Sequence, residues 1–267
     1  MNKVIKREAK NDVKSTIVDV VDGLGGFSKF INRGDVVLLK PNFNTSDPPP
    51  ASTDLDFLRA IVEIVYDYGA KIVMIGDSST MSLNTRRVME ELGIFELEKE
   101  ARPPRIYVFD ERKWVKKEIP RAEYLKTVSV TEYLDRADKL IFLPNLKTHF
   151  QAQFTGSLKL SVGCMKPLQR VWLHLSHIQG KIAELNTIIR PDLVIMDARK
   201  CFINGGPARG KVEEPGLVMA SEDRVLVDVE GIKIIQSFRG NSLKGIDPWR
   251  LPQIEKSVNL GIGKGKN

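Results

Sequence analysis

Cysteine and histidine, the residue types that most often bind metals and clusters, are scarce in this sequence. The chain has 2 cysteines, Cys164 and Cys201, which lie far apart and form no C-x-x-C pattern. This excludes a disulfide framework and an iron–sulfur cluster held within the chain. No apolar run approaches the length of a membrane span, and the start MNKVIKREAKNDVK is too polar for a signal peptide. We therefore expect a cytoplasmic protein with reduced, unpaired cysteines and no membrane partner.

The rest of the composition describes an ordinary globular protein. Hydrophobic residues make up 42% and charged residues 28% of the 267 residues, and no internal repeat or linker divides the chain. We predict a single α/β domain over residues 1–267. The net charge of +7 is spread over all segments, so it fits small anionic ligands as well as nucleic acid. Aromatic residues do not interleave with the basic ones, which ranks nucleic acid last among the candidate partners.

Four apolar runs, each followed by a polar loop, predict the main strands of a sheet. They cover residues 36–40, 72–76, 140–143 and 193–197. Because they alternate with helical patterns, we predict an α/β fold with a mainly parallel sheet and helices on both faces. Residues 114–119 and 126–130 read as two further extended segments, which form a small β-hairpin appendage.

The stretch from residue 140 to residue 177 contains all 3 histidines of the chain. Pro144 and Asn145 end its apolar run and predict a loop. Lys147 and His149 follow just past the strand, where open α/β sheets place their ligand crevice. A scatter of surface lysines and chance clustering of histidines is the alternative reading.

Other polar residues are expected at the same edge of the sheet. Lys40 and Asn42 end the first predicted strand, Asp77 follows the second, and Asp197 ends the fourth. Parallel strands bring such ends to one side. For Asp77, capping of the next helix is favoured slightly over binding of a metal or an anion.

We therefore predict one pocket at the C-terminal edge of the sheet. Three lysines this close would repel one another, so an anion is expected to neutralise them. Imidazole can gain or lose a proton near neutral pH, and a carboxylate can orient a histidine or hold a metal. The candidate catalytic residues are His149, His174, Lys147 and Asp197. The candidate substrate-binding residues are Lys40, Asn42, Lys159, Thr155, Asp77 and Gly206.

Two local patterns are weaker signals. Residues 205–211 spell G-x-x-x-x-G-K, but Val212 replaces the Ser/Thr of a nucleotide P-loop, which leaves a glycine-rich turn facing an anion. His174 and His177 stand three apart, as two metal ligands on one helix face would. No further motif completes a metal shell, so a divalent metal stays open and the cofactor is unassigned.

Five blocks in fixed order resemble the uncharacterised domain-of-unknown-function family numbered three-six-two, which occurs alone or fused to ferredoxin-type iron–sulfur modules. The blocks are VVLLKPNFN, GAKIVMIGDSS, LPNLKTH with TGSLKLSVG, LHLSHIQGKIAELNTIIRPDLVIMD, and NGGPARG with PGLVMASEDRVLVDVEG. The resemblance maps the family's usual features to Lys40-Pro41-Asn42, Lys147-Thr148-His149, Thr155, Lys159, His174, Asp197, Gly206-Pro207 and Asp228.

The sequence departs from that family in two ways. Leu160 follows Lys159 where the family usually has asparagine, and the cluster-binding cysteines of fused members are absent. The leading hypothesis is an enzyme acting on a small anionic metabolite, carboxylate or phosphate. The alternatives are a non-catalytic redox accessory protein that docks a separate ferredoxin-type protein, and a nucleic-acid-binding protein.

Overall fold

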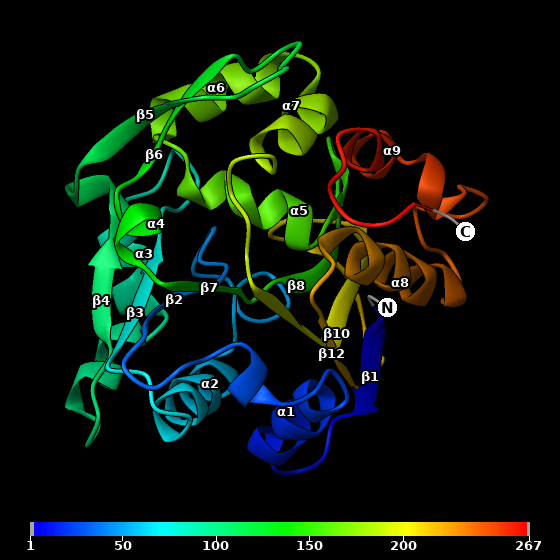
Figure 1. The fold of residues 1–267 in the computed structure, drawn as a ribbon. Coiled ribbons are helices and arrows are strands. Elements are labelled where there is room, and N and C mark those ends of the chain that lie inside the picture. The colour runs from blue at the N-terminus through cyan, green and yellow to red at the C-terminus, as the bar shows by residue number, and fades with distance from the viewer. Residues whose placement is uncertain (1–2, 266–267) are drawn as a thin grey trace.

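A ten-stranded sheet forms the centre of the computed structural model, which describes residues 3–265 (Figure 1). Seven of the strands follow one another in the order β1-β12-β10-β7-β2-β3-β4. The ten strands are β1 (Val4–Glu8), β2 (Val36–Lys40), β3 (Ile72–Asp77), β4 (Arg105–Val108), β7 (Lys139–Phe142), β8 (Asn145–His149), β9 (Gln153–Thr155), β10 (Leu193–Gly205), β11 (Gly210–Glu213) and β12 (Leu217–Ser221).

The middle of this sheet is parallel, as predicted. Strands β10, β7, β2, β3 and β4 pair in parallel, whereas β12 and β1 add an antiparallel edge beside β10. The predicted hairpin also forms: β5 (Trp114–Glu118) and β6 (Thr127–Thr131) pair antiparallel as a separate two-stranded sheet.

Helices cover both faces of the sheet (Figure 1). Helices α1 and α2 pack on one face, and α5 and α8 lie on the other. The helices are α1 (Val13–Asp22), α2 (Leu55–Asp67), α3 (Thr85–Glu91), α4 (Tyr133–Arg136), α5 (Ser157–Leu160), α6 (Pro167–Leu175), α7 (Ile178–Leu185), α8 (Arg224–Ser237) and α9 (Pro252–Asn259). Short 3₁₀ turns cover Phe27–Lys29, Ile94–Lys99, Phe109–Glu111, Ser161–Cys164 and Pro248–Arg250.

Two hydrophobic cores form because side chains alternate between the faces of a strand. In β2, Val37 and Leu39 join the core beneath α1 and α2, whereas Leu38 joins the core on the opposite face. Lys40, two residues after Leu38, therefore points to the face that carries α5 and α6. This alternation decides which strand-end residues reach the pocket described below.

The prediction of a loop after Pro144 was wrong. Residues 145–149 form β8, because β10 runs on past Asp197 and gives them a parallel partner. Strand β9 then pairs with β8 on its other side. Lys147 and His149 are thus held on a strand rather than on a loop.

Two further features complete the comparison with the sequence. Within residues 3–265, no helix has the length and apolar character needed to cross a bilayer. Cys164 and Cys201 are free thiols, which confirms that they are not bonded to each other, and both are buried. Burial raises the pKa of each thiol to about 12.

Candidate functional site

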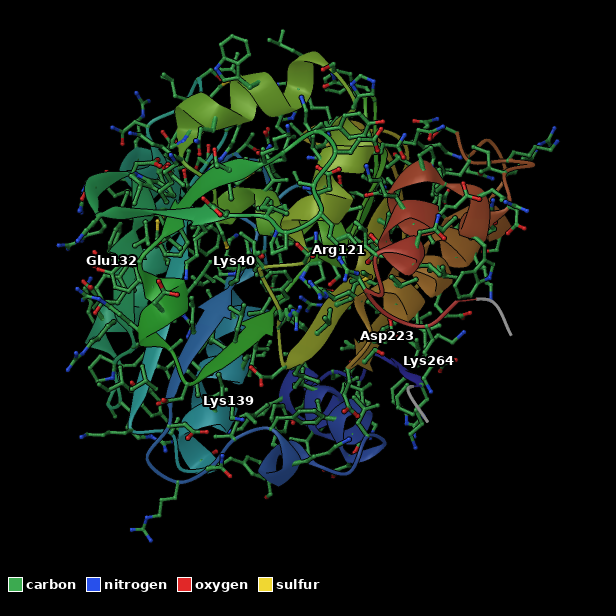
Figure 2. The ribbon with its side chains drawn as sticks, turned by 45° about the horizontal axis from the view of Figure 1, so that its top comes forward. Lys40, Arg121, Glu132, Lys139, Asp223 and Lys264 are labelled. Atoms are coloured by element: carbon green, nitrogen blue, oxygen red, sulfur yellow. The ribbon has the colours of Figure 1, made fainter. Side chains whose placement is uncertain are left out.

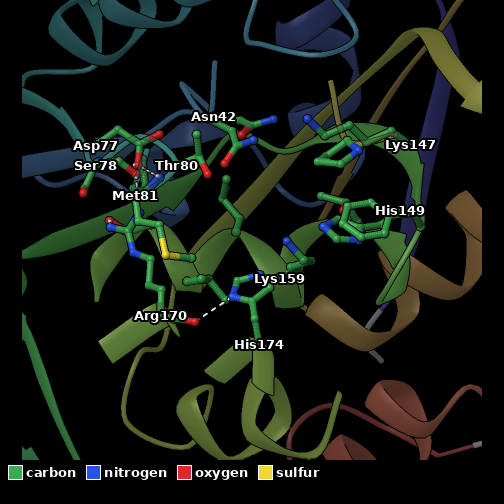
Figure 3. Close-up of a pocket in the computed structure, with 18 residues that line it drawn as sticks. Asn42, Asp77, Ser78, Thr80, Met81, Lys147, His149, Lys159, Arg170 and His174 are labelled. Carbon is green, nitrogen blue, oxygen red and sulfur yellow. Dashed lines mark hydrogen bonds and ion pairs between the residues drawn. The ribbon is translucent and has the colours of Figure 1, made fainter. Parts of the chain in front are cut away.

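A pocket of about 300 Å³ opens between the C-terminal edge of the parallel strands and helix α6 (Figure 3). Its walls come from the ends of β2 and β3, from β8 and β9, and from α5 and α6. The lining residues are Lys40, Asn42, Asn44, Asp77, Ser78, Thr80, Met81, Lys147, His149, Phe150, Thr155, Lys159, Leu160, Val162, Gly163, Arg170, His174 and Pro207.

The structure brings most of the sequence-derived candidates to this pocket. Eight of the ten line it: Lys40, Asn42, Asp77, Lys147, His149, Thr155, Lys159 and His174. The other two, Asp197 and Gly206, are not among the residues that line it. The strand-end rule thus brings residues far apart in the sequence to one cavity.

Asp197 lies on the wrong face of the sheet for the role expected of it. Ile195, two residues earlier on β10, packs in the core beneath α1 and α2, so Asp197 points to the same side. There its carboxylate accepts from Arg199 Nη2 at 2.7 Å and Nε at 3.0 Å. Nη2 of Arg199 also lies 3.0 Å from Oδ1 of Asp54, which is the N-cap residue of α2. Asp197 therefore anchors α2 and orients neither pocket histidine.

Gly206 shapes a turn and does not present its N–H to an anion. That N–H donates to the carbonyl of Arg209 at 2.6 Å, closing the hairpin between β10 and β11. The residue has a φ of +69°, and a Cβ there would lie 2.0 Å from the carbonyl oxygen of Thr148. Only glycine fits here, because the turn passes too close to the backbone of β8 for any side chain and has a positive φ. Pro207, its neighbour, does line the pocket.

Lys40 and Asp77 form a buried ion pair at one end of the pocket. Lys40 Nζ lies 2.6 Å from Asp77 Oδ1, and both side chains are almost fully buried. Asp77 also accepts from the N–H groups of Phe43 and Ser78. The expectation that Asp77 caps a helix was wrong, because Asn84 caps α3. A Cβ at Gly163 would lie 2.4 Å from Asp77 Oδ1, so the chain can pass the pair only as glycine.

Lys147 and Lys159 bring positive charge that no carboxylate of residues 3–265 balances within ion-pair distance. Lys147 Nζ donates to the carbonyl of Ala51 at 2.5 Å. Nζ of Lys159 has no hydrogen-bond partner in the same part of the chain. Burial, reinforced by the charge of Lys159, lowers the pKa of Lys147 to about 7. Burial and the charge of Arg170 lower the pKa of Lys159 to about 8.

The backbone fixes the tautomer of His149. Its Nδ1 accepts the N–H groups of Gln151 and Ala152, each at 3.1 Å. An imidazole nitrogen that accepts carries no proton, so the ring proton of neutral His149 is on Nε2. Burial and the nearby charges of Lys159, His174 and Lys147 lower the pKa of His149 to about 2. His149 is therefore a neutral hydrogen-bond donor at every physiological pH.

His174 has the opposite tautomer. Its Nδ1 lies 2.7 Å from the carbonyl oxygen of Arg170, which can only accept, so the proton is on Nδ1. Its Nε2 is then unprotonated and basic. Burial lowers the pKa of His174, which favours this neutral form. The pocket thus has one imidazole that donates and one that can take a proton (Figure 3).

His177 does not join His174 on a helix face as expected. His177 follows the end of α6 and has a left-handed backbone with a φ of +51°. Its ring stacks on the ring of Tyr124, with 4.3 Å between the two ring centroids. The two-histidine metal site is therefore not formed. Among residues 3–265, no three His, Cys, Asp or Glu side chains are grouped as metal ligands.

Arg170 was missed in the sequence, where an arginine on a short helix reads as a solvated charge. It is 4% exposed and donates to four carbonyl groups, those of Ser78, Ser79, Gly163 and Met165. The guanidinium thereby ties α6 to the loop after β3 and to the turn after α5. It also adds a fourth cation to the pocket wall, beside Lys40, Lys147 and Lys159.

Thr155 supplies a polar atom that the described chain leaves without a partner. Its Oγ1 is buried and has no hydrogen-bond partner within residues 3–265, although the residue lines the pocket. A buried hydroxyl without a partner costs free energy, which a ligand oxygen would recover.

Comparison with known proteins gives a family and a fold. A family model described as "Domain of unknown function (DUF362)" matches residues 37–233. The thylakoid-associated protein sll1697 of Synechocystis sp. is 28% identical over 251 residues, which is 91% of this chain and 73% of that protein.

Two solved structures resemble this chain at 12% identity. The lactate racemase apoprotein from Thermoanaerobacterium thermosaccharolyticum has a TM-score of 0.53 and matches 87% of this chain, which spans 57% of that protein. A structural-genomics target from Thermotoga maritima has a TM-score of 0.48, and the match covers 92% of this chain and 58% of that protein. The first likeness shows that the chain shares an α/β fold with the racemase apoprotein, and nothing about its reaction.

Proposed function

The chain belongs to the DUF362 family, whose name carries no reaction, and we propose that it is an enzyme acting on a small anionic metabolite. The ligand class is a carboxylate or a phosphate. The single observation that carries the proposal is the pair of lysines, Lys147 and Lys159, in a pocket where no carboxylate of residues 3–265 lies within ion-pair distance of either. We place this enzyme in the cytoplasm, as the sequence led us to expect.

The charge balance of the pocket favours an anion. Lys40 and Asp77 neutralise each other, which leaves Lys147, Lys159 and Arg170 as a positive excess. Bringing like charges together out of water is unfavourable unless a counter-charge is present. A ligand anion would supply that charge, and Thr155 and His149 would add neutral donors to its oxygens.

The two histidines would have different roles in a proton transfer, one as a base and one as a hydrogen-bond donor. His174 Nε2 would take a proton from a C–H or O–H of the bound anion. His149 Nε2–H would donate to the oxygen on which negative charge develops, as a neutral imidazole can when its own pKa is depressed. Lys147 and Lys159 would hold the anionic group beside them. The reaction class is therefore proton abstraction next to a carboxylate or phosphate group.

Calorimetric titration tests the binding half of this proposal. The ligands are inorganic phosphate and a panel of small carboxylates, each added to wild-type protein, Lys147→Met and Lys159→Met. Either variant should weaken binding by about tenfold or more, as loss of a charged hydrogen bond does. Lys116→Met is the control, because Lys116 is an exposed lysine outside the pocket. Equal weakening in the control, or no saturable binding of any anion, would contradict the proposal.

Exchange with deuterated water tests the catalytic half. The panel of carboxylates is incubated with protein in D₂O, and loss of a C–H signal is followed by NMR. Exchange of one ligand should require His174 and disappear in His174→Asn. The asparagine amide can still donate to the Arg170 carbonyl, so helix α6 should keep its place.

The two macromolecular alternatives stay predictions from the sequence. A ferredoxin-type partner docked through basic residues should bind at low salt and dissociate at high salt. Nucleic acid should show a steep fall of affinity with salt, because phosphate contacts release counterions.

A further inference from the structure

Helix α6 exposes apolar side chains that globular proteins normally bury. Nine large apolar side chains of residues 3–265 are exposed, and five of them lie on α6 or on the turn between β8 and β9. The five, which we call the α6 face, are Phe150 (78% exposed), Leu168 (72%), Val171 (39%), Trp172 (68%) and Leu175 (67%). A cluster of this kind marks an interaction surface more often than scattered single residues do.

The spacing on α6 makes this surface one face. Leu168, Trp172 and Leu175 stand four and three residues apart, so they line one side of the helix. Leu173, on the opposite side, is fully buried. Phe150 extends the surface, because Gln151 of the same turn donates to the carbonyl of His174 in the last turn of α6. The helix therefore has two apolar sides, and only one of them packs against other residues of the described range 3–265.

Basic residues outnumber acidic ones in the chain segments that form and adjoin the α6 face. The sequence has no Asp or Glu from Lys139 to Ala183. The neighbouring hairpin, residues 113–130, carries five basic residues and two acidic ones. It is attached to α6: the N–H of Ser129 donates to Gln169 Oε1 at 2.6 Å, and the N–H of Lys166 donates to the carbonyl of Ser129.

These charges argue against a second copy of the chain as the occupant. A two-fold contact would bring each basic region against the same region of its partner, and like charges would repel. Helix α6 lies in the outermost layer of the molecule (Figure 1), and side chains project outward from it (Figure 2). Projecting Trp, Leu and Phe side chains with basic neighbours suit the boundary between lipid headgroups and acyl chains.

We propose that the α6 face seats the protein on the surface of an anionic lipid bilayer. Leu168, Trp172, Leu175 and Phe150 enter the interface, and the basic residues of the hairpin meet the headgroups. Such contact requires no membrane-spanning helix. The sequence-based expectation of no membrane partner rested on the lack of a long apolar run, which bears on spanning and not on surface contact.

Co-sedimentation with lipid vesicles tests the proposal. Wild-type protein is mixed with vesicles of pure phosphatidylcholine and with vesicles that also contain phosphatidylglycerol. We expect the wild-type protein to bind the anionic vesicles. The double variant Leu168→Ser, Trp172→Ser should bind them at least about tenfold more weakly, because it lacks two of the large exposed apolar side chains. Val212→Ser is the matched control, since Val212 is 44% exposed and lies on β11. Circular dichroism and anion binding check that the variants are folded, because neither Leu168 nor Trp172 lines the pocket.

Three results would overturn the proposal. The first is a wild-type protein that binds neither kind of vesicle. The second is equal binding by the double variant, which would mean that charge elsewhere holds the protein. The third is a protein–protein contact through the α6 face without vesicle binding. It would be seen as a dimer in light scattering, or as capture of an acidic ferredoxin-type protein, and the double variant would abolish it. Failure here leaves the anion pocket untouched, because the two surfaces are tested with different variants and ligands.

Discussion

At the scale of single residues, the buried ammonium group of Lys147 destabilises the folded state. Lys147 is 1% exposed, and its pKa falls to about 7 because burial disfavours the ammonium form. In the unfolded chain the same lysine keeps its ordinary pKa of about 10.4. Between these values the unfolded state binds a proton that the folded state lacks, so this lysine makes stability rise with pH. Below pH 7 its cost is fully present.

Lys147→Met should remove this pH dependence. We expect the unfolding free energy of wild-type protein to gain about 3–4 kcal/mol relative to the variant between about pH 7 and pH 10. Denaturant unfolding at each pH measures the difference, and titrating groups away from the pocket cancel because both proteins share them. Lys116→Met, at an exposed lysine, should follow the wild-type curve. Parallel curves for Lys147→Met would mean that Lys147 is not desolvated.

The two pocket histidines should differ in NMR spectra of the protein without ligand. Long-range ¹H–¹⁵N correlation should show His149 protonated on Nε2 and His174 on Nδ1, because backbone groups fix each tautomer. His174 should charge at a lower pH than an ordinary histidine, since burial lowers its pKa, and His149 should stay neutral down to still lower pH. His149→Asn and His174→Asn assign the signals. A charged His149 near pH 6 would refute the donor role.

At the scale of elements, one buried side chain ties α6 to two other parts of the chain. Arg170 joins it to the loop after β3 and to the turn after α5 through four carbonyl acceptors. Arg170→Lys keeps the charge but loses the planar fork that reaches several acceptors. We expect it to destabilise the protein by about 2–4 kcal/mol, because buried carbonyls lose their donors. Thermal or denaturant unfolding measures this. Lys166→Ala, at an exposed residue before α6, should cost little.

The elements also show where sequence reasoning succeeds and where it stops. Apolar runs predicted β2, β3, β7 and the start of β10, because buried parallel strands are continuously apolar. Strand β8 could not be read from its residues: Asn, Lys, Thr and His are polar, and only the length of β10 makes them a strand. Asp197 was misplaced because the strand-end rule gives the edge, whereas the facing side depends on alternation along β10. Arg170 offered no signal, since two of its acceptors, the carbonyls of Ser78 and Ser79, lie in the distant loop after β3.

At the scale of the whole molecule, the pocket and the fold should be coupled through the anion. A ligand that binds only the folded state stabilises it by an amount that grows with ligand concentration. Phosphate or a matching carboxylate should therefore raise the melting temperature in a saturable way. A non-saturable rise would instead be the general effect of an excluded salt. Lys147→Met combined with Lys159→Met should abolish only the saturable part.

The same coupling predicts a direction with pH. Lys147 and Lys159 lose their charges as pH rises through about 7 and about 8, so the unliganded pocket becomes less positive. Anion affinity should therefore fall between about pH 6 and pH 9, because binding to neutral amines requires a proton to be taken up. The shift of melting temperature at fixed ligand concentration, measured across that range, reports this change. An affinity that stays constant or rises with pH would show that the two lysines do not hold the ligand as ammonium groups.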